Sequence, residues 1–421
     1  MDVLSTIISG LWKFEFYYPL FMAYLWMIGG LYYYYHREAG RTHHIEDTPV
    51  LREYPPVSII VPCYNEGRNI AETIQYLAGQ QYPDFEIIAV NDGSTDDTGI
   101  ILDKLSSQYP DLRVVHLAAN QGKAMALRMG AMLSRHEFLV CIDGDAVLDP
   151  RATTWMMSNF VDASRVGAVT GNPRVRTRST LLGKIQVGEF SSIIGLIKRA
   201  QRIYGRMFTV SGVVAAFRKS ALQEVGYWRL DMVTEDIDIS WKLQLNHWDI
   251  RFEPNALCWI KMPETYRGLW RQRLRWAQGG MEALIAYLPN FWSWRKRRMW
   301  GIYLEYITSV FWAYTMAVII VLWLAGLVIN LPQILQIPTV IPNWNGILLG
   351  VTCLIQFLVS MIIDSRYERD FGKYYYWIIW YPVVYWILNV LTTVVAVPRA
   401  IFGKRGKRAR WVSPDRGLQA P

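Results

Sequence analysis

The chain has 421 residues, of which 52% are hydrophobic, 14% aromatic and only 19% charged. This composition is too apolar for a disordered protein and too poor in charge for an ordinary soluble protein of this length. Four cysteines exclude a disulfide scaffold, and no pair of them has the spacing of a metal site. We therefore looked first for membrane segments.

Three long stretches carry no charged residue: 17–35, 306–363 and 374–398. Roughly 20 apolar residues form one helix across a bilayer, so the middle stretch is long enough for two crossings. Pro332, Pro338 and Pro342 would lie in the connection between those two crossings. The sequence predicts four spanning segments, one early and three late.

Basic residues flank these segments on one side. Arg37 and Arg41 follow the first segment, and 295–298 is a basic run before the second. Because basic loops stay inside, the stretch between the membrane regions should be cytoplasmic. These flanks also account for the net charge of +9, which disfavours nucleic-acid binding.

The side of the C-terminus stays open at this point. Three late crossings would put it outside, whereas Lys404, Arg405 and the basic residues after them favour the inside. A re-entrant late segment, or a break at Pro382, would remove the conflict.

Between the membrane regions, short apolar runs alternate with helical patterns. Strands are predicted at 57–61, 85–90, 112–117 and 137–142, and helices at 66–80, 97–105 and 123–133. This alternation indicates an α/β domain with a mostly parallel sheet and helices on both faces. We divide the chain into 1–41 (membrane segment), 42–265 (cytoplasmic domain), 266–300 (interfacial helices) and 301–421 (membrane region and basic tail).

Polar clusters follow three of the predicted strands, and ligands of such sheets bind at the carboxyl ends of strands. Asp143-Gly144-Asp145 follows the fourth strand, where two carboxylates could hold a divalent cation together with a diphosphate. A plain turn is the simpler interpretation of Asp-Gly-Asp alone. Asp92, after the second strand, could accept a hydrogen bond from a uracil-like base, or could also belong to a turn.

Two further segments have both a structural and a functional interpretation. Thr234-Glu235-Asp236 precedes an amphipathic run and suits either a helix N-cap or a general base. Residues 266–288 and 189–204 look like interfacial amphipathic helices, and Arg275 in the first of them could reach a diphosphate. No glycine-rich phosphate loop is present, which argues against a Rossmann dehydrogenase or a P-loop NTPase.

Together these motifs resemble the processive family 2 membrane glycosyltransferases, which make cellulose, chitin, hyaluronan and poly-N-acetylglucosamine. The motifs in order are Pro62-Cys63-Tyr64-Asn65-Glu66, Asn91-Asp92-Gly93-Ser94, Gly122-Lys123-Ala124, Asp143-Gly144-Asp145, Thr234-Glu235-Asp236 and Gln272-Arg273-Leu274-Arg275-Trp276. Size, layout and the tail Arg410-Trp411-Val412-Ser413-Pro414 are most similar to the bacterial enzymes of this family that make β-1,6-linked poly-N-acetylglucosamine.

The resemblance implies a GT-A fold and a role for each matching residue. Asp236 would be the catalytic base, and Asp143 and Asp145 would bind the donor diphosphate and Mg²⁺ or Mn²⁺. The remaining implied roles are Pro62, Tyr64, Glu66 and Asp92 for the uridine, Lys123 for the donor pocket, Gln272, Arg275 and Trp276 for the diphosphate and acceptor, and Ser211 and Gly212 for the acceptor.

The implied activity is inverting polymerisation of N-acetylglucosamine from UDP-GlcNAc onto a growing polysaccharide, with export across the bacterial inner membrane. Hyaluronan, chitin or a cellulose-like polymer remain alternatives, as do a non-processive lipid-directed transferase and a transporter. Too few residues follow the last predicted membrane segment for the PilZ module by which cellulose synthases bind cyclic di-GMP. We therefore expect a small membrane partner subunit that shares this nucleotide.

Overall fold

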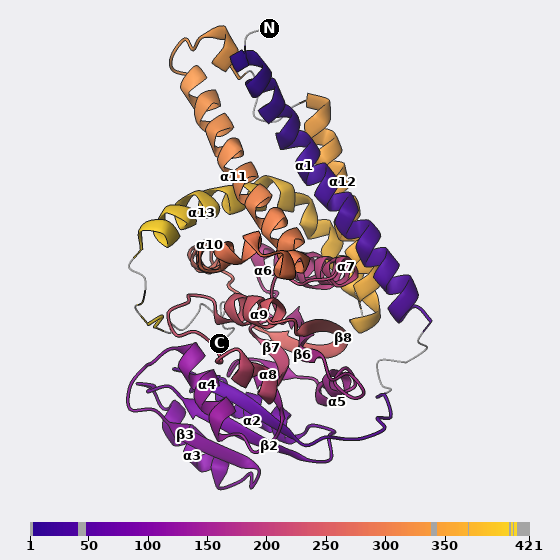
Figure 1. Cartoon of the computed structure of the whole chain (residues 1–421), viewed down its shortest axis with the longest axis vertical. Helices are drawn as coiled ribbons and strands as arrows, with labels where there is room; N and C mark the ends of the chain where they lie inside the picture. The colour runs from indigo at the N-terminus through magenta and orange to yellow at the C-terminus, as the bar shows by residue number, and fades with distance from the viewer. Residues whose placement is uncertain are drawn as a thin grey trace.

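The computed structural model describes residues 3–40, 48–337, 343–368, 370–403, 406 and 408–410. An α/β domain forms the lower part of the molecule, and long helices rise from it (Figure 1). Several residues used above lie outside the described residues, namely Arg41, Pro338, Pro342, Lys404, Arg405, Lys407 and 411–414.

One eight-stranded sheet forms the centre of the domain, in the order β3-β2-β1-β4-β7-β6-β8-β5. Its strands are β1 (Val57–Cys63), β2 (Phe85–Asn91), β3 (Leu112–His116), β4 (Phe138–Ile142), β5 (Val147–Leu148), β6 (Val166–Val175), β7 (Val214–Arg218) and β8 (Asp249–Ile260). Strands β3, β2, β1 and β4 are parallel, whereas β7 is antiparallel to β4 and β6. The predicted α/β fold class is confirmed.

The strand and helix predictions for the first half of the domain hold with one visible shift. The domain helices are α2 (Ile70–Ala78), α3 (Thr98–Ser106), α4 (Lys123–Leu133), α5 (Ala152–Met157), α8 (Lys219–Glu224) and α9 (Glu235–Leu245). Helix α2 begins at Ile70 rather than at 66, because Asn65 has a left-handed φ of 54° and the chain turns there before the helix starts.

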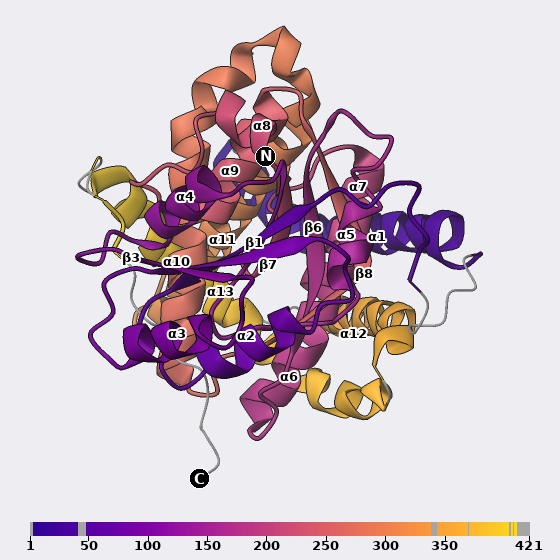
Figure 2. The same cartoon turned by 90° about the horizontal axis from the view of Figure 1, so that it is seen from below.

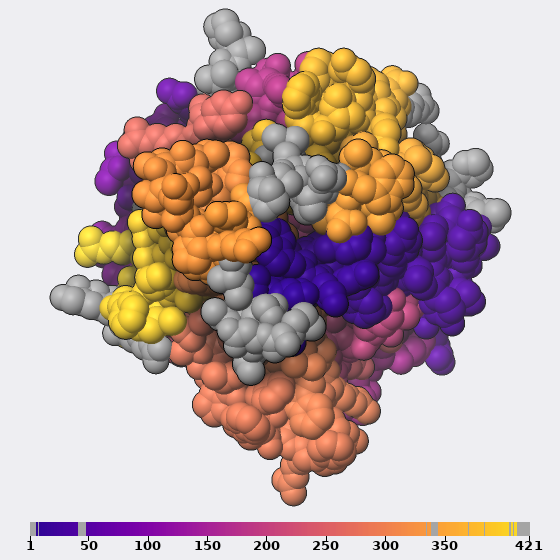
Figure 3. All heavy atoms as spheres, turned by 90° about the horizontal axis from the view of Figure 1, so that it is seen from above, coloured from indigo at the N-terminus to yellow at the C-terminus, as the bar shows by residue number. Residues whose placement is uncertain are grey.

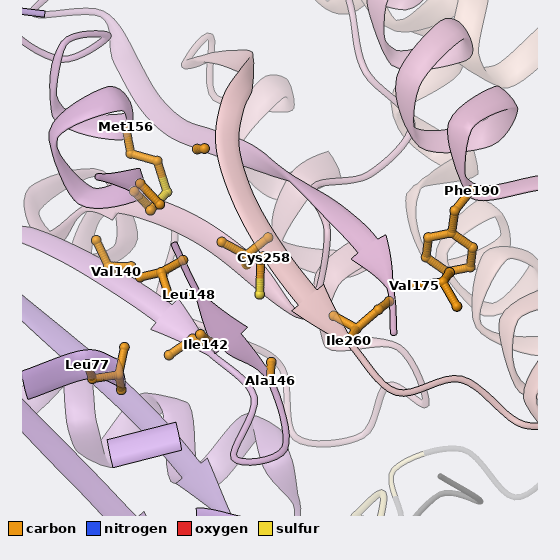
Figure 4. Packing of buried hydrophobic residues seen from close by; sticks show 14 of the residues in the cluster. Leu77, Val140, Ile142, Ala146, Leu148, Met156, Val175, Phe190, Cys258 and Ile260 are labelled. Atoms are coloured by element: carbon orange, nitrogen blue, oxygen red, sulfur yellow. The ribbon is translucent and has the colours of Figure 1, made fainter. Parts of the chain in front are cut away.

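Alternate residues of β1 face opposite layers, as the period of a strand requires. Ile59 packs in one buried cluster with Ile74 of α2, and Ile60 packs in another with Leu127 of α4. Seen from below, α2 and α3 lie on one side of the strands, and α4 and α9 on the other (Figure 2). Figure 4 shows part of the first cluster, including Ile142 and Cys258.

A layer of helices joins the domain to the long helices. It consists of α6 (Leu181–Phe190), the π-helix η2 (Ser191–Ile197), α7 (Lys198–Tyr204) and α10 (Tyr266–Tyr287). The expected interfacial helix at 189–204 is therefore three segments. Its charged residues Glu189 and Arg199 are fully buried in ion pairs with Arg273 and Glu38, so this part of the segment is packed inside the protein.

The long helices are α1 (Val3–Tyr33), α11 (Trp300–Gly326), α12 (Asn343–Asp364) and α13 (Tyr381–Phe402). Short 3₁₀ segments precede or connect them: η3 (Leu288–Trp292) and η4 (Trp294–Met299) between α10 and α11, η5 (Gln333–Leu335) between α11 and α12, and η6 (Ser365–Tyr367) and η7 (Phe371–Trp380) between α12 and α13. Seen from above, α1 lies between α11 and α12 (Figure 3), and it packs against both.

Among the described residues, three segments are long and apolar enough to cross a membrane: Trp294–Gly326, Trp344–Tyr367 and Val384–Phe402. They correspond to the three predicted late segments. Helix α1 is not among them, although it is 31 residues long. Helices α1 and α11 extend beyond the uncharged runs, so they also carry Glu15 and Glu305.

Helix α13 differs in direction from the other long helices. In Figure 1 it runs across the base of α1, α11 and α12 instead of rising beside them, and it packs along α10. The predicted break at Pro382 coincides with its start, where a proline occupies the first turn and η7 precedes it.

Candidate active site

The ends of the parallel strands bring three of the predicted motifs into contact. Asn65, which follows β1, donates its backbone N–H to Ser94 Oγ at 3.0 Å. A Cβ placed on Gly144, which follows β4, would lie 3.1 Å from Glu66 Cγ and 3.3 Å from the carbonyl oxygen of Pro62. The three loops are thus packed together at one edge of the sheet, as predicted.

Asp92 lies at the bottom of this edge and is fully buried. Its two carboxylate oxygens accept the backbone N–H groups of Gln121 and Gly122, each at 2.8 Å. Burial raises the pKa of Asp92, and these two hydrogen bonds oppose the rise. The carboxylate therefore fixes the loop before α4, while Tyr64 is half-buried in the β1 loop.

Lys123, the first residue of α4, connects three of the predicted motifs. Its Nζ lies 2.6 Å from Asp143 Oδ1 and 3.1 Å from Glu235 Oε1, and it donates to the carbonyl oxygen of Gly212 at 2.9 Å. Burial disfavours the ammonium, but Asp143 and Glu235 outweigh burial and raise the pKa of Lys123. One cation therefore holds the Asp-Gly-Asp turn, the start of α9 and the Ser211–Gly212 loop together.

Asp236 faces the loop that the resemblance assigned to the acceptor. A Cβ on Gly212 would lie only 3.0 Å from Asp236 Oδ2, so a glycine keeps this position open. Burial, and then the charge of Glu235, raise the pKa of Asp236 to about 6. A half-buried carboxylate with such a pKa can be ionised at neutral pH and still accept a proton.

Thr234-Glu235-Asp236 lies at the start of a helix, as the structural interpretation predicted. Thr234 occupies the N-cap position of α9, and the two acidic residues lie in its first turn, where the helix dipole favours them. The Thr234 hydroxyl is buried and makes no capping hydrogen bond.

Asp143 and Asp145 are half-buried and close enough to influence each other. Burial, followed by the charge of Asp143, raises the pKa of Asp145 to about 7. Two neighbouring carboxylates favour a bound cation, and Lys123 already pairs with Asp143. The described residues contain no cluster of three or more His, Cys, Asp or Glu side chains suited to a metal, so a metal here would depend on this pair.

Helix α10 covers the cleft and carries the Gln272-Arg273-Leu274-Arg275-Trp276 motif. Burial raises the pKa of Glu235, but the charges of Lys123 and then of the exposed Arg275 lower it, and the net shift is downward. Arg275 is therefore close to the cleft. Gln272 is directed toward Met262 and has a buried oxygen without a partner. Trp276 packs against Phe190 and under the guanidinium of Arg273.

Two contacts at the site were not predicted. Lys198 of α7 is buried, donates to Thr170 Oγ1 at 3.0 Å, and has its pKa lowered to about 7 by burial, with Asp236 opposing. The tail returns to the α/β domain, because Ala409 donates its N–H to the carbonyl oxygen of Leu230 at 2.9 Å. Nothing in the sequence distinguished Lys198 from the neighbouring Arg199 and Arg202, and nothing placed the tail.

A cavity of about 450 Å³ lies where the domain meets α1, α11, α12 and α13. Its lining includes Thr209, just before the Ser211–Gly212 loop, and the aromatic side chains of Tyr306, Trp312, Tyr381 and Trp386. Carbohydrate rings stack readily on such aromatic faces. The cavity thus lies between the segment that precedes the Ser211–Gly212 loop and the long helices.

Residues 55–279, more than half of the chain, match the family model described as "Glycosyltransferase like family 2". The chain belongs to this family, and its candidate membrane helices make it a membrane glycosyltransferase.

The chain is also similar to named relatives and to a solved structure. The chain is 40% identical over 97% of its length to a poly-beta-1,6-N-acetyl-D-glucosamine synthase of Staphylococcus epidermidis, 98% of which is covered. It is 40% identical over 96% of its length to the synthase of that name from Staphylococcus aureus (strain COL), again with 98% covered. The mannosyltransferase PcManGT from Pyrobaculum calidifontis, solved with GDP-Man and Mn²⁺, shares the fold, with a TM-score of 0.58 at 19% identity over 96% of this chain and all of that one.

Proposed function

We propose that this protein is an inverting, processive glycosyltransferase that polymerises N-acetylglucosamine from UDP-GlcNAc into a β-1,6-linked polymer and exports it. The relatives that match it over nearly the full length carry that activity in their names. The structural observation that supports it best is the position of Asp236. It lies between the carboxylate cleft and the loop that leads into the cavity among the long helices.

The reaction joins an acceptor hydroxyl to the anomeric carbon of the donor sugar. Asp236 takes the proton of that hydroxyl, and the new bond forms on the face opposite the departing UDP, so an α-linked donor gives a β-linked product. Lys123 keeps Glu235 ionised and fixes the Ser211–Gly212 loop, which positions the acceptor. The pKa of Asp236, about 6, allows it to act as the base at neutral pH.

The leaving diphosphate lies between two groups of side chains. Asp145 and Asp143 would hold a divalent cation, Mg²⁺ or Mn²⁺, which supplies positive charge to the diphosphate. On the other side Arg275, and with it Gln272, would contact the diphosphate from α10, because the charge of Arg275 already reaches the carboxylates of this cleft. Trp276 would stack on the acceptor sugar.

The uridine would bind at the joined β1 and β2 loops. Pro62, Tyr64 and Glu66 line this edge, and Asp92 would accept from the N–H of the base with the lone pairs that Gln121 and Gly122 leave free.

The proposed activity is tested by incubating membranes that contain the protein with UDP-GlcNAc, or with UDP-glucose, and digesting the product. A polymer formed from UDP-GlcNAc that a β-1,6-specific hydrolase degrades is the expected result. Digestion by a chitinase instead would identify a β-1,4 polymer. Synthesis that requires UDP-glucuronate as well would indicate a hyaluronan-type product. Either outcome would contradict the proposal.

We further propose that the protein lies in the inner membrane with its catalytic domain in the cytoplasm. Helices α1, α11 and α12 would cross the bilayer, whereas α13 would lie along its inner surface beside α10 (Figure 1). Helices α11 and α12 would cross the bilayer out and back, so the tail lies on the same side as the catalytic domain, where Ala409 is. Single cysteines at Asn330 and Gly406 test this, since a membrane-impermeant maleimide should label intact cells only at position 330.

A small membrane partner subunit that shares a cyclic di-GMP site remains part of the proposal. Its support is the resemblance to synthases that work with such a subunit. Purification of this chain alone provides the test: full synthesis without a partner and without the nucleotide would refute it.

A further inference from the structure

A histidine outside every motif contacts the Asn91-Asp92-Gly93-Ser94 turn from the side away from the cleft. His116 ends β3 and is paired with Asn91, which ends the parallel strand β2. Nδ1 of His116 lies 3.0 Å from Asn91 Nδ2, and Nε2 lies 2.9 Å from Asp103 Oδ1 of α3. Both β3 and α3 are at the lower end of the domain, away from the long helices (Figure 1). The ring therefore joins the outer helix α3 to a loop of the candidate active site.

The donor and acceptor of each hydrogen bond in this row follow from its neighbours. Asn91 Oδ1 accepts the backbone N–H of Ser94 at 3.1 Å, so the amide presents its NH₂ group to His116. Turning the amide over would set that group against the N–H of Ser94. We therefore assign the accepting role to Nδ1 and the ring hydrogen to Nε2, which donates to Asp103.

From Ser94 the row continues into the β1 loop. Ser94 Oγ accepts the backbone N–H of Asn65 at 3.0 Å, and Asn65 Oδ1 accepts the backbone N–H of Thr95 at 2.9 Å. These bonds hold Asn65 in its left-handed conformation, with a φ of 54°. The orientation of the Asn91 amide thus determines how the β1 and β2 loops meet.

Asn91 is buried, whereas the side chain of His116 is 42% exposed. A Cβ on Gly99 of α3 would lie 3.1 Å from Asn91 Nδ2 and 3.5 Å from His116 Cε1, so the helix backbone packs directly on the pair. Within the part of the chain that the structure describes, Asn91 Nδ2 has no acceptor other than His116. A buried amide that loses its acceptor is costly, so the orientation of Asn91 depends on Nδ1.

We propose that His116 is a positioning residue for the nucleotide of the donor: its accepting Nδ1 orients Asn91, and Asn91 orders the β1 and β2 loops around the uridine. This inference rests on the proposed function, which places the uridine at these loops. Because His116 lies behind the loops and far along the chain from the base Asp236, its loss should weaken donor binding and leave the chemical step unchanged.

Two amide substitutions separate the roles of the two ring nitrogens. In His116→Asn the side-chain oxygen takes the place of Nδ1 and accepts from Asn91. In His116→Gln the amide extends to the place of Nε2, so Asn91 loses its acceptor while Asp103 keeps a donor. A role confined to packing would not distinguish an acceptor at one ring position from a donor at the other.

UDP affinity of the purified full chain is measured by calorimetry in the presence of Mg²⁺, and KM and kcat for UDP-GlcNAc are measured in membranes. His116→Gln should weaken UDP binding and raise KM about five- to tenfold with kcat within about twofold, and His116→Asn should stay within about twofold of the wild type in all three. His136→Gln is the matched control and should behave like the wild type, because among the described residues the ring of His136 makes no hydrogen bond.

Equal UDP affinity of His116→Gln and the wild type overturns the inference. An equal loss in His116→Asn and His116→Gln also overturns it, because the accepting nitrogen would then have no special part. UDP binding that changes as expected, without any polymer made from UDP-GlcNAc, supports the inference and contradicts the proposed activity alone. A wild type that does not bind UDP contradicts both.

A variant at the surface covers the case in which His116→Gln shows no cooperative melting transition. Asp103, whose side chain is 65% exposed, holds the ring hydrogen on Nε2. Asp103→Ala should therefore raise KM about threefold with unchanged kcat, and an unchanged KM would overturn the inference.

Discussion

Lys123 and Asp143 form the shortest link between α4 and the Asp-Gly-Asp turn, with 2.6 Å between Nζ and Oδ1. The same ammonium is 3.1 Å from Glu235, so it compensates two carboxylates in a cleft that also holds Asp145 and Asp236. Removing one partner of a buried charge group leaves the others uncompensated, which costs more than the group contributes intact. The electrostatics of the cleft therefore depend on this lysine.

Lys123→Met should reduce kcat/KM for UDP-GlcNAc by about two orders of magnitude, which is the effect of removing one preorganised charge from an active site. Lys123→Arg keeps the charge and should retain more activity than Lys123→Met. Initial rates of sugar incorporation and UDP affinity measure the effect. Equal activity of the methionine variant and the wild type would show that the ammonium has no part in the reaction.

The pH dependence of the reaction follows from Asp236. Its pKa of about 6 means that the ionised base is lost as the pH falls below that value, so kcat/KM should decline about tenfold per pH unit there. Lys123 lowers this pKa because a cation favours the carboxylate. In Lys123→Met the pKa should rise, and the acid limb of the profile should move to higher pH. A profile measured over roughly pH 5 to 9 decides this, and an unmoved limb would mean that another group titrates.

Asp236→Asn should abolish turnover while donor binding survives, since asparagine fills the same space but cannot accept the proton. The expected loss in kcat is about 10²- to 10⁴-fold. UDP affinity, measured by calorimetry, serves as the control for folding. Polymerisation near the wild-type rate would make the assignment of the base wrong.

Asp145→Ala should remove the metal-dependent part of donor binding. Its carboxyl has a pKa of about 7 because of burial and the charge of Asp143, which a divalent cation would relieve. UDP affinity of the wild type should therefore rise with added Mg²⁺ or Mn²⁺, and that of the variant should not. The same increase in both proteins would place the metal elsewhere.

Sequence patterns were sufficient for the fold of the domain because the buried strands are short apolar runs ending at polar residues. Val57 to Val61 is such a run, and β1 indeed occupies 57–63. They also placed Asp92 and Asp143 at one edge, since parallel strands end on the same side, whereas Asp236 lies in the first turn of α9 and follows no parallel strand.

Long-range pairing was not predictable in the same way. Glu189 and Arg273 are separated by 84 residues and neutralise each other inside the protein, so charges that seemed to indicate a surface helix are buried. The direction of α13 likewise depends on its packing against α10, which periodicity does not contain.

Gly279 is where α10 approaches the start of α9 most closely. A Cβ at this position would lie 1.9 Å from Oγ1 and 2.4 Å from Cγ2 of Thr234, the residue before Glu235 and Asp236. Gly279→Ala should therefore push α10, with Arg275, away from the cleft, at a cost of about 1–3 kcal/mol of stability and with a loss of turnover. Gly301→Ala is the control, because a Cβ on Gly301 of α11 meets nothing within 4 Å. The collision itself is tested by the double variant Gly279→Ala/Thr234→Ala, which should be more stable than additivity predicts, since Thr234→Ala removes the two closest atoms and leaves only Cβ, at 2.6 Å. Melting temperatures of the wild type, Gly279→Ala, Thr234→Ala and the double variant close the cycle. If Gly279→Ala melts and turns over like Gly301→Ala, the packing of α10 on α9 does not hold Arg275 in place.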